Sequence, residues 1–330
     1  MTENHFPPEI KAEISRICSS LPSGASCIAT GSIVEGFGNK NSDIDLYAVL
    51  DEEVRGQGTA IGIRKSRYVD CEFMTLDALA RLSSHVVKFS WGAVGDRKLA
   101  DYDRYYRLSI GLPVLVSEPA AEVLALFRVE TAREQFARWA RFRAFEHLAR
   151  AATALACRQD EHAGFLLRAG SAWISTSTLA DEGEGYPSLK WLGEKAARRH
   201  GRGSKAFHEL VDDWIRPSGS SADRLARLRD RVDLPPEALR AVTEKSGVLG
   251  DGVAYRGGSD VNFLIGPRRR IIRTDHLTSL LCERLGAGIS WGEATDDIAA
   301  ALSVPGSEVA TALWSQTSNL RSNGFIQQTC

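Results

Sequence analysis

The sequence feature that most constrains this chain is the stretch 31–50, in which a Gly-Ser pair is followed by two aspartates at the start of an apolar run. Asp43 and Asp45 alternate there with the apolar residues Ile44 and Leu46, a spacing that predicts a β-strand. Alternate side chains of a strand share one face, so both carboxylates point to one side and the apolar residues to the other. The stretch therefore predicts a sheet that carries two neighbouring carboxylates on one face.

The carboxylates of Asp43 and Asp45 predict a cation site, because like charges held side by side repel each other and a divalent cation can bridge them. The Gly31-Ser32 pair ends an earlier apolar run and offers backbone amides and a hydroxyl that a phosphate can approach closely. Ser42 lies directly before the first carboxylate and is assigned with this pair to nucleotide binding. A phosphate-binding turn beside paired carboxylates indicates a site for a metal-bound nucleoside triphosphate.

The residues around this stretch predict an α+β unit, a mixed sheet with helices, that ends near Pro113. Gly56, Gly58 and Gly62 lie between its second and third predicted strands, where we expect a mobile connection. The predicted elements are a helix over 9–21, strands over 25–30, 43–50 and 66–74, and a helix over 76–82 that begins after Thr75 as its N-cap.

The strand predicted over 66–74 carries two further acids, Asp70 and Glu72, on the face opposite to its apolar residues. Because these acids share a face, either carboxylate could complete a metal site with Asp43 and Asp45. The residues themselves leave this choice open.

The rest of the sequence predicts two more domains, so the whole chain is expected to have three. Residues 122–159 contain few helix breakers, and helical patterns continue from there to the linker 247–252. The basic run 195–205 is expected to be a solvated loop. A predicted β-hairpin over 262–273 then precedes three short helices, a pattern typical of a winged-helix-type module. The predicted domains are 1–113, 114–246 and 252–330.

Composition limits the functions that such a chain can have. The 330 residues are 43% hydrophobic and 25% charged, which is ordinary for a globular protein with a sizeable core. The formal net charge of −1 argues against binding nucleic acid by bulk charge. A polar N-terminus and the lack of a long apolar run predict a cytoplasmic protein without a membrane segment. The six scattered cysteines are therefore expected to be reduced and buried.

Three short motifs in the first third of the chain resemble the nucleotidyltransferase superfamily. They are Gly31-Ser32, Ser42-Asp43-Ile44-Asp45 and Val69-Asp70-Cys71-Glu72, and their order, spacing and strand context together are more specific than an Asp-x-Asp pair alone. The resemblance implies a polymerase-β-like fold and transfer of a nucleoside monophosphate to an acceptor, with release of pyrophosphate. It also implies two Mg²⁺ ions and ATP or another nucleoside triphosphate.

The same resemblance implies roles for individual residues. Asp43 and Asp45 would hold the two Mg²⁺ ions, and the amides of Gly31-Ser32 would hold the β- and γ-phosphates. The third acid of the family comes early in its strand, which favours Asp70 as the third metal ligand. Glu72 would then lie beside the site or act as a base directed toward the acceptor.

The segment Tyr186–Trp191 resembles the helical half of antibiotic-type nucleotidyltransferases, in which a lysine faces the catalytic cleft. Lys190 would then contact triphosphate oxygens as a point charge. A surface lysine beside a buried Trp191 explains the segment equally well, so both interpretations stay open. The implied acceptor is a hydroxyl of a small molecule, such as an antibiotic or a natural-product intermediate, rather than tRNA.

The segment from about residue 252 to 326 resembles the PqqD-like peptide-recognition modules of ribosomal-peptide biosynthesis. The resemblance implies that a peptide adds as a strand to the hairpin edge, so one alternative function is a nucleotide-sensing, peptide-docking protein. A DNA-binding winged helix with Arg268–Arg270 in its wing competes with this interpretation, although Glu293, Asp296 and Asp297 disfavour it. Transfer of AMP onto a partner protein, as in toxin–antitoxin pairs, is a further alternative.

Overall fold

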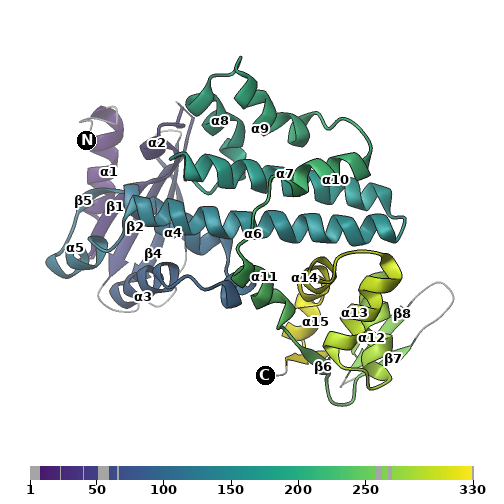
Figure 1. The fold of residues 1–330 in the computed structure, drawn as a ribbon. Helices are drawn as coiled ribbons and strands as arrows, with labels where there is room; N and C mark the ends of the chain where they lie inside the picture. The colour runs from purple at the N-terminus through teal and green to yellow at the C-terminus, as the bar shows by residue number, and fades with distance from the viewer. Residues whose placement is uncertain are drawn as a thin grey trace. The chain divides into compact units, whose positions relative to one another are not determined.

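The computed structural model describes residues 8–22, 24–39, 41–50, 59–64, 67–256, 262–266 and 270–328 (Figure 1). Contacts within the chain divide it into two units. The first unit comprises residues 1–89, 96–138 and 176–207, and the second comprises residues 90–95, 139–175 and 208–330. The fold is mixed α+β and 61% helical, which confirms the predicted fold class. The division into three domains stays a prediction.

A five-stranded mixed sheet forms the centre of the first unit, with the strand order β3-β4-β2-β1-β5. The predicted strands are confirmed to within about two residues at their ends. β2 and β4 run parallel, and the other neighbours are antiparallel. The apolar set predicted on β2 lies in the core, since Ile44, Leu46 and Ala48 are buried. The strands are β1 (Ser26–Thr30), β2 (Ile44–Leu50), β3 (Thr59–Arg64), β4 (Arg67–Thr75) and β5 (Leu112–Leu115).

Helices pack on this sheet and continue the predicted pattern. The helices of this unit are α1 (Pro8–Cys18), α2 (Gly31–Glu35), α3 (Leu76–Val87), α4 (Leu99–Ile110), α5 (Glu118–Leu124) and α8 (Leu192–His200), with the 3-10 turn η2 (Leu189–Trp191). Thr75 caps α3 as predicted, because its hydroxyl oxygen accepts the Ala78 N–H at 3.0 Å. Ile14 of α1 and Leu46 of β2 belong to the same buried core, which fixes α1 on the sheet.

Two parts of the first unit differ from the expectation. The Gly31-Ser32 pair begins the short helix α2 instead of forming an open turn. Strand β3 occupies residues 59–64, including Gly62, where we expected a mobile connection, while Gly56 and Gly58 lie outside the described residues. β3 forms because it pairs along the edge of β4, with Thr59 opposite Glu72 and Arg64 opposite Arg67. Such pairing is a tertiary effect that local composition does not reveal.

Cys18 of α1 and Cys27 of β1 form a disulfide, with their Cα atoms 6.0 Å apart. The expectation that every cysteine is reduced is therefore wrong for this pair. Cys71 and Cys282 are free and buried, as expected. The pair escapes sequence analysis because its members lie on two different elements that meet only in the folded chain.

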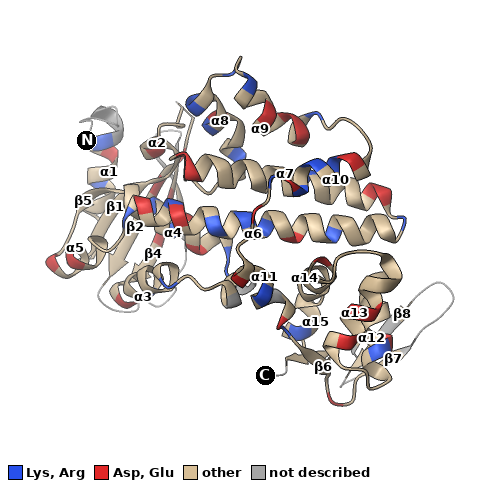
Figure 2. Cartoon of the chain, in the orientation of Figure 1, with Lys and Arg blue, Asp and Glu red and all other residues tan. Residues whose placement is uncertain are grey.

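The long helices α6 (Val129–Ala156) and α7 (Asp160–Asp181) contribute residues to both units. They run antiparallel (Figure 1), and Trp139 of α6 packs edge-on against Trp173 of α7 with ring centroids 5.1 Å apart. Acidic and basic residues are interspersed along α6 (Figure 2). The helical stretch predicted over 122–159 is interrupted, because α5 ends at Leu124 and α6 begins at Val129. None of the described helices is long and apolar enough to cross a membrane.

The second unit continues with α9 (Lys205–Ile215), α10 (Ser221–Arg229) and α11 (Pro236–Thr243), and η1 (Trp91–Asp96) precedes α4 in the chain. A three-stranded antiparallel sheet follows, with the strand order β7-β8-β9. Its strands are β7 (Ala254–Arg256), β8 (Asn262–Gly266) and β9 (Arg270–Thr274), and the helices after it are α12 (His276–Gly286), α13 (Trp291–Leu302), α14 (Gly306–Gln316) and α15 (Ser318–Ser322).

The predicted hairpin and three helices of this C-terminal part are present, and they share a core that includes Leu264, Leu281, Trp291 and Leu313. The expected linker 247–252 is partly a strand. β6 (Gly247–Leu249) pairs with β10 (Ile326–Gln328), the last described strand of the chain. Arg268 and Arg269 of the proposed wing lie outside the described residues. The winged-helix and PqqD-like assignments stay predictions.

Candidate active site

The acids predicted as metal ligands lie together on two neighbouring parallel strands. Asp45 of β2 is the direct cross-strand partner of Asp70 of β4, and Asp43 immediately precedes β2. Burial raises the pKa of the Asp45 carboxyl, and Arg107 opposes this shift, while the charges of Asp70 and Asp43 add to it. The carboxylates of Asp43 and Asp70 are therefore both close enough to act on the Asp45 carboxyl.

Gly31 lies directly against the Asp45 carboxylate. Its φ of +81° is a left-handed conformation that favours glycine, and a Cβ at this position would lie 1.9 Å from Asp45 Oδ2. The chain then turns back on itself, because the N–H groups of Phe37 and Gly38 both donate to the Ser32 carbonyl at 2.8 Å. Glycine is thus required both by the backbone conformation and by the space that the carboxylate takes.

A cavity of about 470 Å³ opens in front of these residues. Five of its lining residues are site residues that the sequence predicted, whereas Gly31 and Asp70 are not among the lining residues. Lys190 lines this cavity, and its Nζ also lies 5.0 Å from the ring centroid of Trp191. The full lining is Ser32, Asn39, Asn41, Ser42, Asp43, Asp45, Arg107, Tyr186, Ser188, Lys190 and Trp191.

Arg107 of α4 is a cavity residue that the sequence analysis missed. Its Nη1 lies 3.3 Å from Asp45 Oδ1, and its Nε lies 2.8 Å from Asp103 Oδ2. These two carboxylates raise the pKa of Arg107 above its usual value despite its burial, so the guanidinium stays charged. The spacing of Asp103 and Arg107 predicts a helical ion pair, but nothing local indicates the partner Asp45.

Glu72 faces a different environment from the other acids. Its Oε1 forms an ion pair with Arg104 Nε at 2.6 Å. It lines a second cavity of about 430 Å³, which also includes Met74 of β4 and Arg81 of α3. Of the two candidate third acids, only Asp70 is the direct cross-strand partner of Asp45.

Aromatic side chains form one wall of the 470 Å³ cavity and connect it to α2. The ring of Phe37 stacks on Trp191 with centroids 5.3 Å apart and an interplanar angle of 11°. The Arg198 guanidinium of α8 lies 4.2 Å from the Phe37 ring centroid. Arg198 also donates to the Glu35 carbonyl at 2.8 Å and to Glu35 Oε1 at 2.7 Å. This arginine therefore holds the end of α2 against the cavity wall.

The basic run 195–205 is only in part the expected solvated loop, because residues 201–203 form an exposed turn whereas the preceding residues are helical. Its first part belongs to α8, and Lys195 is fully buried. Lys195 Nζ donates to the Tyr186 carbonyl at 2.6 Å, which fixes the segment that lines the cavity. Burial lowers the pKa of Lys195 to about 8, although Glu184 and Glu35 oppose the shift. Lys195 therefore has a structural role, which its position in a basic run does not indicate.

The donor set fits a divalent cation in its chemistry. Asp43, Asp45 and Asp70 offer hard carboxylate oxygens, the donors that Mg²⁺ prefers, and the space that Gly31 leaves lets the Asp45 carboxylate approach the backbone closely. Arg107 supplies the positive charge beside Asp45. Within the described ranges, no group of three or more His, Cys, Asp or Glu side chains is arranged to hold a metal ion.

Comparison with known proteins identifies the first part of the chain. Residues 11–89 match the family model described as nucleotidyltransferase domain. Among solved structures, a nucleotidyltransferase-like protein from Exiguobacterium sibiricum 255-15 is similar with 11% identity and a TM-score of 0.37, over 71% of this chain and 75% of that one. No curated protein matches the sequence. The chain therefore contains a nucleotidyltransferase domain at residues 11–89, and this domain includes Asp43, Asp45 and Asp70.

Proposed function

We propose that the protein transfers a nucleoside monophosphate, AMP from ATP, to a hydroxyl of a small molecule and releases pyrophosphate. The observation that carries this proposal is the contact between Gly31 and the Asp45 carboxylate. It sets the backbone of the Gly-Ser pair directly beside the acidic cluster. Triphosphate oxygens and carboxylates need a shared cation when they lie this close, so the arrangement supports binding of a metal-bound nucleotide.

In this proposal Asp43, Asp45 and Asp70 hold two Mg²⁺ ions. Bound there, the ions would neutralise the triphosphate and lower the pKa of the acceptor hydroxyl. Gly31 and Ser32 hold the β- and γ-phosphates through their amides.

Two further polar side chains complete the proposed nucleotide site. Ser42 adds a hydroxyl at the strand start, beside the carboxylates. Lys190 contacts phosphate oxygens as a point charge, and its position among the lining residues supports this role.

The cavity supports a small acceptor. Its volume of about 470 Å³ lies in the usual range for small-molecule sites, and Tyr186 and Trp191 give it an aromatic wall. A net charge of −1 and the mixed charges along α6 (Figure 2) give no extended basic surface on that helix for a nucleic acid. We propose an antibiotic or a natural-product intermediate as the acceptor class.

The test is pyrophosphate release from mixed nucleoside triphosphates with Mg²⁺ and a library of hydroxyl-bearing small molecules. Asp43→Asn should abolish release while the fold stays intact by circular dichroism, because it removes one of the carboxylates that would hold the ions. Asp77→Asn is the matched control, since Asp77 is an exposed acid of the same domain that pairs with Arg81. Release by Asp43→Asn at the rate of the unmodified protein would show that the acid assignment is wrong.

One observation favours a second candidate, a nucleotide-sensing protein that docks a peptide. β9 is an edge strand of its sheet, and its Ile271 is 63% exposed opposite Ile265, which is 37% exposed. An apolar pair at a strand edge is suited to adding a peptide strand. Tight nucleotide binding without pyrophosphate release, together with anisotropy changes of labelled peptides, would favour this candidate over the enzyme.

A further inference from the structure

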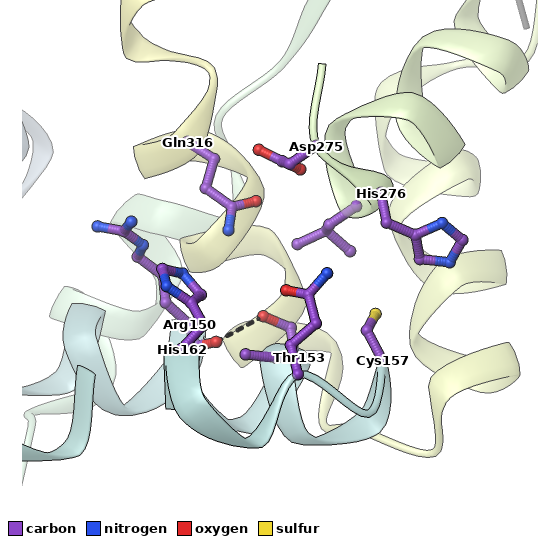
Figure 3. Close-up of a pocket in the computed structure, with 10 residues that line it drawn as sticks. Arg150, Thr153, Cys157, His162, Asp275, His276 and Gln316 are labelled. Carbon is purple, nitrogen blue, oxygen red and sulfur yellow. Dashed lines mark hydrogen bonds between the residues drawn. The ribbon is translucent and has the colours of Figure 1, made fainter. Parts of the chain in front are cut away.

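A second polar cavity lies in the second unit, and the proposed transfer reaction does not use it. It has a volume of about 220 Å³, which corresponds to roughly seven water molecules of liquid. Three parts of the chain enclose it, namely the C-terminal end of α6 with the start of α7, the start of α12, and the end of α14 (Figure 3). Its walls therefore come from segments far apart in the sequence.

The lining of this cavity includes polar groups that lack partners among the described residues. Arg150 of α6 is partly buried, and no described residue accepts a hydrogen bond from its buried Nε. Its guanidinium has no carboxylate partner among the described residues. The buried Oε1 of Gln316 likewise has no donor in the described part of the chain. Unpaired buried polar atoms are costly, so each of these groups favours a ligand that would satisfy it.

The lining also includes a carboxylate, Asp275, together with His162 and Cys157. His162 and Arg150 lie toward the left of the cavity in Figure 3, whereas Asp275 lies above its centre and Cys157 toward the right. Asp275 caps α12 by accepting the Thr278 N–H at 2.8 Å, and its carboxylate retains free lone pairs for another donor. The lining thus offers a cationic donor in Arg150 and acceptors in Gln316 and Asp275.

A ligand that matches both sets of groups carries an anionic group for Arg150 and a hydrogen-bond donor for Gln316 and Asp275. The Arg150 guanidinium, whose Nε has no acceptor among the described residues, is suited to an anion, and a carboxylate matches its planar fork. Gln316 Oε1 requires a hydrogen-bond donor and the Asp275 carboxylate can accept a further one, so an ammonium group satisfies both of them. We propose that this cavity binds a small zwitterion with one carboxylate and one ammonium group, of the free amino-acid class.

The experiment uses the full-length protein without nucleotide. Thermal unfolding and calorimetry are measured with a panel of free L-amino acids, and with propionate and propylamine, each of which carries only one of the two functional groups of an amino acid. We expect at least one amino acid to bind and raise the melting temperature, because a ligand of the folded state stabilises it by mass action. Propionate and propylamine should give no comparable shift. No shift with any amino acid, or an equal shift with propionate alone, overturns the proposal.

Variants locate the binding. Arg150→Gln should weaken the affinity at least about tenfold, since it removes a charged hydrogen-bond donor. Arg158→Gln is the matched control, because Arg158 is exposed, follows α6 and does not line the cavity. Gln316→Leu should weaken binding as well and serves if Arg150→Gln does not fold. Asp43→Asn should leave binding unchanged. Unchanged affinity in both Arg150→Gln and Gln316→Leu places the ligand elsewhere and overturns the proposal.

Discussion

The two polar cavities of this molecule differ in how their charges are balanced. In the first unit, Asp45 is paired with Arg107, and Arg107 is also paired with Asp103. In the second unit, Arg150 and Gln316 carry polar atoms without partners among the described residues. In the cavity of the first unit, the charges of Asp45, Arg107 and Asp103 therefore neutralise one another, so that changes there should affect folding and activity together. The second cavity needs a ligand to complete it, so changes there should affect binding first.

The largest effect is expected for Gly31→Ala. A Cβ would lie 1.9 Å from Asp45 Oδ2, and the φ of +81° is unfavourable for alanine. We expect nucleotidyl transfer to fall by more than about 100-fold and stability to fall by about 1–3 kcal/mol. Pyrophosphate release and urea unfolding measure the two effects.

Gly193→Ala is the control for this substitution. Gly193 lies within α8, and a Cβ there meets nothing within 4 Å. Alanine should therefore stabilise the helix by up to about 1 kcal/mol and leave transfer unchanged. If Gly31→Ala behaves like Gly193→Ala, the close approach of backbone and carboxylate is not needed for the reaction.

Sequence reasoning succeeded where the information is local. The alternation around Asp43 and Asp45 predicts β2 because each apolar residue of the pattern enters the same core. Thr75 as the N-cap of α3 is correct because capping depends on neighbouring residues only. The cluster of Asp45 and Asp70 follows from two strand patterns, once a parallel pairing of the strands is assumed.

Sequence reasoning failed where distant residues meet. The contacts of Arg107 with Asp45 and of Arg198 with Glu35 join elements that only tertiary packing brings together. Lys195 looks like one more exposed lysine of a basic run, yet packing of α8 buries it and supplies its acceptor, the Tyr186 carbonyl. A charge pattern does not indicate which charged side chains are buried, so the ion pairs and hydrogen bonds around the cavity could not be predicted from the sequence.

Lys195 tests whether a buried charge beside the first cavity lowers the free energy of unfolding. Its pKa is lowered from 10.5 in the unfolded chain to about 8 in the folded protein, so the unfolded state binds more protons between these values. The stability of the unmodified protein should therefore rise between pH 8 and pH 10.5, by up to about 3 kcal/mol relative to Lys195→Met.

Urea unfolding at several pH values measures this difference. Lys88→Met is the control, because Lys88 is exposed and its loss should leave the pH dependence of the unmodified protein unchanged. A Lys195→Met variant whose stability follows the same pH profile as the Lys88→Met variant would show that Lys195 is not buried as a charge.

The smallest effect is expected for the loss of Arg107, which is the shared ion-pair partner of Asp45 and Asp103. Arg107→Gln leaves Asp45 and Asp103 without their shared cation, so we expect a loss of about 1–2 kcal/mol in stability, less than for a fully buried pair because Arg107 is partly exposed. Arg104→Gln is the matched control on the same helix, since its partner Glu72 faces the other cavity.

If the acidic cluster takes up Mg²⁺, the ion should restore more stability to Arg107→Gln than to Arg104→Gln, because only the former has lost the positive charge beside Asp45. Thermal unfolding with and without Mg²⁺ measures this difference. Equal responses of the two variants would mean that Mg²⁺ does not bind at the Asp45 carboxylate.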